Sequence, residues 1–137
     1  MRWLLVIRHL PIESLHPDAI HAAAGAACAG RQNRFWQMHN KLFEVTGPLN
    51  DRHVRDLALE LSLDPKAFDA CVSLEGQAVA RADIASAESL SISGTPTFLI
   101  GKLVEPNRLE VTAVLEGAEP FAAFARVLDP LLSDEWR

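Results

Sequence analysis

The segment from Ser91 to Gly101 constrains the fold most, because it joins a Gly-Thr-Pro turn to a short apolar strand. Pro96 has no backbone N–H and therefore belongs at the first position of a strand, and its neighbour Thr95 is held in an extended conformation. The strand predicted after this turn runs from Thr97 to Ile100. A Thr-Pro bond at such a tight entry can be cis, although an ordinary trans bond is the more frequent arrangement.

Composition limits the classes of function that the chain can have. The 137 residues suit one domain, and 49% hydrophobic with 23% charged residues is typical of a soluble globular protein. The net charge of −5 and the lack of a Lys/Arg cluster argue against nucleic acid or an anionic membrane as the main partner. The apolar run Trp3 to Ile7 is too short for a signal-peptide core or a membrane span, so we expect a cytoplasmic protein.

Hydrophobic periodicity and turn residues predict the order strand, five helices, two strands, helix. The continuous apolar character of Arg2 to Leu10 indicates a strand that is covered on both faces. A hairpin-like return with its turn at Gly101-Lys102 follows the Thr97 strand, and Leu109 to Leu115 is the next strand. The predicted helices run from Pro17 to Ala29, Phe35 to Glu44, Asp51 to Leu61, Pro65 to Cys71, Glu75 to Leu90, and from Pro120 through Leu131.

The two cysteines, Cys28 and Cys71, both lie in helical patterns, and the sequence contains no C-x-x-C. A free cysteine in such a pattern behaves as a small buried hydrophobic residue. A cytoplasmic chain also keeps its thiols reduced. We therefore favour two inert core thiols over a structural disulfide.

Several short motifs, in this order, resemble the DsbA-like branch of the thioredoxin superfamily. The resemblance covers nearly the whole chain, and the agreement of several motifs makes it more specific than any one of them. The motifs are Arg8-His9-Leu10-Pro11, Ala26-Ala27-Cys28-Ala29, Phe35-Trp36-Gln37-Met38-His39, Phe68-Asp69-Ala70-Cys71-Val72 and Gly94-Thr95-Pro96-Thr97-Phe98.

The resemblance implies a truncated thioredoxin-like α/β fold in a single domain, 1–137. A small mixed sheet and a terminal helix would come from residues 1–13 and 91–137, and residues 14–90 would form a five-helix insertion between the first strand and the cis-proline strand. Gly94, Thr95 and Pro96 would be the cis-proline loop, with the backbone of Thr95 offered to an extended peptide.

The family's Cys-x-x-Cys has no counterpart here. Members carry it at a helix N-terminus, ahead of the segment that resembles Arg2 to Pro11, and such a position lowers the pKa of the attacking thiol. Neither Cys28 nor Cys71 has that position, so we name no catalytic residue. The family's central strand, next to Thr97–Ile100, is missing as well, and open strand edges seek partners. We therefore expect Trp3–Ile7 to move across to that strand, or a second chain to fill the gap in a homodimer.

Other kinds of site find little support. The five histidines show no compact ligand spacing, so we expect no metal and no cofactor. His39 is most simply a hydrogen-bonded core residue, and Phe35, Trp36 and Phe43 are core rather than a cofactor platform. The surroundings of Ser93 lack the G-x-S-x-G pattern of a serine hydrolase.

Three interpretations of function remain open. The first is a degenerate DsbA-like protein that binds a peptide or a protein partner at Gly94–Pro96 without redox chemistry. The second is a true thiol–disulfide oxidoreductase whose Cys-x-x-Cys lies upstream of Met1 or in a partner. The third is a glutathione-dependent transferase or isomerase of the kappa type, which shares the fold.

Overall fold

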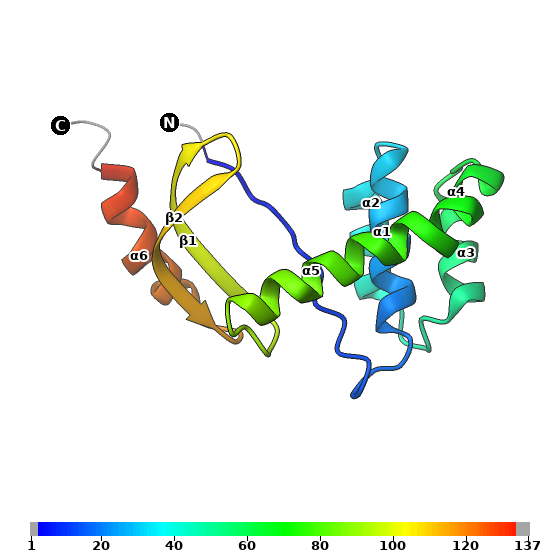
Figure 1. Cartoon of the computed structure of the whole chain (residues 1–137), viewed down its shortest axis with the longest axis horizontal. Helices are drawn as coiled ribbons and strands as arrows, with labels where there is room; N and C mark the ends of the chain where they lie inside the picture. Colours follow the sequence, from blue (N-terminus) through cyan, green and yellow to red (C-terminus); the bar gives the residue numbers. More distant parts are fainter. Residues whose placement is uncertain (1–2, 134–137) are drawn as a thin grey trace. The chain divides into compact units, whose positions relative to one another are not determined.

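The computed structural model describes residues 3–133 and divides the chain into two compact units. The helical unit comprises residues 8–91, and the hairpin unit comprises residues 3–7 together with 92–133. The α/β class predicted from the sequence is confirmed (Figure 1). The single-domain assignment stays a prediction.

Five α-helices and one π-helical turn form the helical unit, as the spacing of apolar residues predicts (Figure 1). Asn50 accepts a hydrogen bond from the His53 N–H at the start of one helix, and Asp64 caps the next. The elements are α1 (Ala19–Arg31), α2 (Phe35–Glu44), α3 (Asp51–Glu60), α4 (Pro65–Cys71), η1 (Val72–Gly76) and α5 (Gln77–Ser89).

Helix α1 is the centre of this unit, because its alanines let four other helices approach closely. Ala24 and Ala29 are fully buried, and a side chain at Gly25 would overlap with Val54 of α3. The largest fully buried side chains are Phe68, Met38, Val54 and Cys28. Every buried residue within 3–133 belongs to the helical unit, which therefore holds the core.

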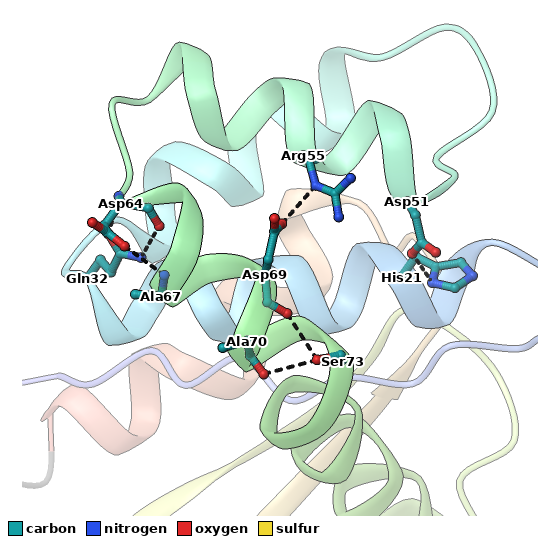
Figure 2. A network of polar contacts seen from close by, with 9 residues as sticks. All are labelled: His21, Gln32, Asp51, Arg55, Asp64, Ala67, Asp69, Ala70 and Ser73. Atoms are coloured by element: carbon teal, nitrogen blue, oxygen red, sulfur yellow. Dashed lines mark hydrogen bonds and ion pairs between the residues drawn. The ribbon is translucent and has the colours of Figure 1, made fainter.

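Polar bridges fix the helices relative to one another (Figure 2). The Gln32 side chain accepts a hydrogen bond from the Asp64 N–H at 2.8 Å, which joins the end of α1 to the start of α4. Arg55 Nε lies 2.8 Å from the carboxylate of Asp69 and links α3 to α4. Both bridges are exposed to solvent and contribute to geometry more than to stability.

The hairpin unit contains β1 (Thr97–Glu105), β2 (Arg108–Glu116) and α6 (Phe121–Ser133). The two strands pair antiparallel, with Phe98 opposite Leu115 and Ile100 opposite Ala113. Helix α6 covers this face of the hairpin, where the rings of Phe98 and Phe124 meet edge to face at 4.8 Å.

Two details of the hairpin differ from the sequence prediction. The turn lies at Pro106-Asn107 and not at Gly101-Lys102, since β1 continues through Gly101 as far as Glu105. Gly101 sits beside a bulge in β2, where a side chain would collide with the backbone of Glu110. The glycine therefore allows close backbone approach within a strand and does not mark its end.

The predicted first strand, Arg2 to Leu10, is not formed in its described part. Residues 3–10 carry no strand assignment, and the sheet within residues 3–133 consists of β1 and β2 alone, so it is antiparallel and not mixed. A strand exists only through hydrogen bonds to a neighbouring strand. The apolar residues of this segment favour an extended backbone, but within residues 3–133 no other strand pairs with it.

Candidate peptide-docking site

The loop Gly94–Pro96 precedes β1 and is exposed on the hairpin unit. The Thr95–Pro96 peptide bond is cis. Two hydrogen bonds hold the loop against the hairpin: Thr97 Oγ1 donates to the Gly94 carbonyl at 2.8 Å, and the Gly117 N–H donates to the Pro96 carbonyl at 2.8 Å. The loop is thus fixed on both sides of Thr95.

Thr95 itself has an open backbone. Among the hydrogen bonds formed within residues 3–133, none uses its N–H or its carbonyl, and the residue is exposed. An exposed donor and acceptor on one residue can form the pair of bonds that joins two antiparallel strands. This is the arrangement that the sequence resemblance implies for Thr95.

The edge of β1 extends this open backbone into a strand-length surface. In the described chain, β1 pairs with β2 on one side only. Its residues from Thr97 to Leu103 are paired one after another, whereas β2 carries Thr112 as an extra residue between Val111 and Ala113. Bulges disfavour strand addition, so the better edge is the part of β1 from Thr97 to Leu103, which ends before the extra residue Val104 of β1.

Cys28 and Cys71 form a disulfide bond, which corrects the expectation of two free thiols. The bond joins the last turn of α1 to the end of α4, where the two Cα atoms are 5.8 Å apart. Gly76 makes room for it, because a side chain there would collide with the Cys28 sulfur. The helical period had placed both residues in the core, but sequence spacing could not show that they face each other.

This disulfide lies in the helical unit and is almost inaccessible to solvent. Cys28 is 1% exposed and Cys71 is 9% exposed, and neither sits at the N-terminus of a helix. Thiol–disulfide exchange requires access of a thiolate to a sulfur atom. The geometry therefore suits a crosslink between helices and not a catalytic pair.

Asp83, which the sequence analysis did not single out, anchors the Arg8-His9 motif to α5. It is 8% exposed, and its carboxylate accepts hydrogen bonds from Arg8 Nε at 2.6 Å and from the His9 N–H at 2.8 Å. Burial lowers the pKa of His9, and the nearby His39 and Arg8 act in the same direction, while Asp83 opposes them. An Asp among small residues on a helix gives no sequence signal of such a long-range contact.

Trp36 and Phe43 of α2 lie on the surface, which corrects their assignment to the core, whereas Phe35 is partly buried and packs against the core as expected. Trp36 is 46% exposed and Phe43 is 81% exposed, while Met38 is the residue of α2 that is buried. The His39 ring packs 5.6 Å from Phe35 and 4.9 Å from Phe43, so it makes ring contacts where we expected core hydrogen bonding.

Two open hollows of about 190 and 280 Å³ in the helical unit fall below the ~300 Å³ of typical ligand pockets. No group of three His, Cys, Asp or Glu side chains within residues 3–133 is arranged to hold a metal ion. None of the helices in the same range has the length and apolar character that crossing a bilayer requires.

Comparison with known protein families shows to which family the chain belongs. The family of DSBA-like thioredoxin domains matches residues 4–129. The chain belongs to this family. The DsbA-like relationship inferred from the short motifs is thereby confirmed, and the family is of the thiol–disulfide oxidoreductase type.

Curated relatives share only this part of their length. The chain is 40% identical over 96 residues to a protein named Na(+)/H(+) antiporter NhaA 1 of Salinispora arenicola, covering 69% of this chain but 15% of that protein. It is 36% identical over 123 residues to Na(+)/H(+) antiporter NhaA of Herminiimonas arsenicoxydans, covering 82% and 18% respectively. The DsbA-like chain thus spans less than a fifth of these relatives. No solved structure matches it significantly.

Proposed function

We propose that this DsbA-like chain binds extended polypeptide at Gly94–Pro96 and along the edge of β1, and that its own cysteines serve only as a structural crosslink. The observation that carries the proposal is the open N–H and carbonyl of Thr95 on an exposed loop that continues into an open strand edge. Strand addition of this kind takes its affinity from main-chain hydrogen bonds.

A pair of substitutions at Thr95 tests the contribution of its backbone. Thr95→Pro removes the N–H donor, whereas Thr95→Ala keeps the donor and removes only the side chain. We expect the first variant to weaken binding of a fluorescein-labelled extended octapeptide by about tenfold, and the second to change it little. Fluorescence anisotropy measures the affinity, and far-UV circular dichroism verifies that both variants are folded.

A second set of peptides keeps the test independent of how Thr95→Pro folds. N-methylation of alternate residues removes the donors on one edge of an extended peptide and leaves those on the other edge. Because an alternately methylated peptide keeps one complete edge of donors, it should still bind the wild-type chain, whereas a peptide that is N-methylated at every residue should lose binding. Equal binding of both would contradict strand addition.

Family membership favours a second candidate function, thiol–disulfide exchange by the longer protein or assembly to which such a chain can belong. In that case the Cys-x-x-Cys comes from outside these 137 residues, because the buried Cys28–Cys71 bond does not suit the reaction. We expect no reduction of insulin by the chain above the buffer rate. Turnover that disappears in the Cys28→Ser/Cys71→Ser variant would overturn the assignment of a structural crosslink.

A further inference from the structure

Within residues 3–133, the hairpin unit contains one strand edge and one apolar segment that are not paired with another strand. The first is the edge of β1, described above. The second is the segment Trp3–Ile7, which belongs to the same unit and has no ladder hydrogen bonds within residues 3–133. Trp3, Leu4, Leu5 and Val6 are 76%, 73%, 51% and 62% exposed. Exposure of so many large apolar side chains in a row marks an interaction surface.

The chemistry of Trp3–Ile7 matches that of β1. All five of its residues are apolar, so an extended arrangement presents apolar side chains on both faces. The first half of β1 also has apolar side chains on both faces, with Phe98 and Ile100 on one and Leu99 on the other. A strand that is apolar on both faces suits a sheet that is covered on both sides.

The hairpin unit also lacks a core of its own. None of residues 92–133 is buried, and on the face away from Phe98 the side chains Leu103, Leu109, Val111 and Val114 remain 41–55% exposed. A two-stranded hairpin is marginally stable in water and gains independent stability from a third strand.

We propose that a second copy of the chain supplies this third strand, with Trp3–Ile7 of each copy paired along the β1 edge of the other. Such reciprocal exchange uses the same two surfaces in both directions, as two-fold symmetry requires. This dimer proposal rests on the proposed function, because it uses the same edge of β1 as the docking site. In the dimer that edge is occupied, so exchange and the binding of foreign peptide exclude each other.

The first test measures molar mass by size-exclusion chromatography with light scattering at micromolar to submicromolar concentration. We expect twice the monomer mass at the higher concentrations. In the variant Leu4→Lys/Leu5→Lys, each face of the segment receives one charge. The dimer dissociation constant should rise at least about tenfold, since burial of two apolar side chains is lost in each copy.

A matched control separates exchange from general hydrophobic association. Leu15 and Leu59 in the helical unit are 69% and 53% exposed, close to the values of Leu4 and Leu5. The variant Leu15→Lys/Leu59→Lys should keep the wild-type dissociation constant. An equal effect of the two double variants would overturn the proposal.

A second measurement requires no substitution and identifies the exchanged segment. An excess of the peptide Trp-Leu-Leu-Val-Ile should convert the wild-type dimer into monomer, and Trp-Lys-Lys-Val-Ile should not. A wild-type chain that is monomeric throughout overturns exchange, even if it binds the labelled octapeptide. A dimer that neither peptide dissociates also overturns it. Failure of the octapeptide to bind a monomeric chain would instead count against the proposed function.

Discussion

At the scale of single residues, Asp83 is the buried charged side chain of the described chain, and its two partners come from a segment about 75 positions away. Arg8 is largely exposed, so its ion pair is weakened by solvent. The bond from the His9 N–H gives Asp83 a second role, because it holds a backbone donor in place. Asp83 therefore connects the chain before α1 to α5.

Asp83→Ala should lower the free energy of unfolding by about 1–3 kcal/mol, because it leaves a partly buried N–H without a partner. Urea denaturation followed by circular dichroism measures the change. The matched control is Glu60→Ala, which removes the exposed ion pair of Lys41 with Glu60 and should lower the free energy of unfolding far less. Equal losses in the two variants would contradict the anchoring role of Asp83.

His9 makes stability depend on pH. Its pKa in the folded chain is lowered, chiefly by burial, below the ordinary value near 6.5, so the unfolded chain binds the proton more readily. The contribution of His9 is complete above pH 6.5 and is lost as the pH falls from there toward the folded pKa. NMR titration of the His9 ring should give a pKa below 6.5. In the His9→Gln variant, the decline of stability with falling pH should be smaller.

At the scale of elements, local sequence signals predicted the helices, whereas the pairing of the strands depends on contacts between residues far apart in the sequence. Asn50 caps the start of α3, Asp64 caps α4 ahead of Pro65, and the left-handed residue Asn33, with φ of 60°, follows the end of α1. Each of these signals acts within four residues of itself. The fate of Arg2–Leu10 depended on a neighbouring strand, which no local pattern can show.

In the candidate site, too, local features could be predicted from the sequence and contacts between distant residues could not. The loop Gly94–Pro96 could be located because a Gly-Thr-Pro turn restricts its own backbone. The Cys28–Cys71 bond and the Asp83 anchor join residues 43 and about 75 positions apart, so composition and helical period gave no sign of either. The turn of the hairpin was misplaced because Gly101 serves a bulge, and glycine signals bulges and turns alike.

The crosslink between α1 and α4 should stabilise the helical unit. In the chain-entropy description, a disulfide closing a loop of 43 residues contributes about 4 kcal/mol. The variant Cys28→Ser/Cys71→Ser should therefore lose about 2–4 kcal/mol in guanidinium denaturation. The wild-type chain with its disulfide reduced should show a similar loss. Unchanged stability in both would show that the bond does not form in solution.

At the scale of the whole molecule, the disulfide bears on where the chain functions. Structural disulfides persist in oxidising compartments and are rare in the cytoplasm. The cytoplasmic location expected from the sequence stays a prediction, and the Cys28–Cys71 bond argues against it. Thiol alkylation of the chain in intact cells, followed by a gel-shift assay, should show both cysteines protected.

The separation of the core from the hairpin predicts unequal local stability. All buried residues of the described chain lie in the helical unit, so amides of α1 and α3 should exchange hydrogen slowly. Amides of β1 and β2 should exchange much faster in the unliganded monomer, at concentrations below the dimer dissociation constant, and slow down when an extended peptide binds. Hydrogen exchange followed by mass spectrometry measures both. Uniform protection of the two units would contradict this division.

The same crosslink has a mechanical consequence. When the chain is pulled from its two ends, force passes from α1 to α4 through the sulfur atoms and bypasses the stretch between Cys28 and Cys71. Cys28 and Cys71 are separated by 43 backbone steps of about 3.5 Å each, so the stretched contour is about 15 nm shorter than that of the reduced chain. Helices α2 and α3 lie within the shielded stretch and carry no tension until the disulfide is reduced.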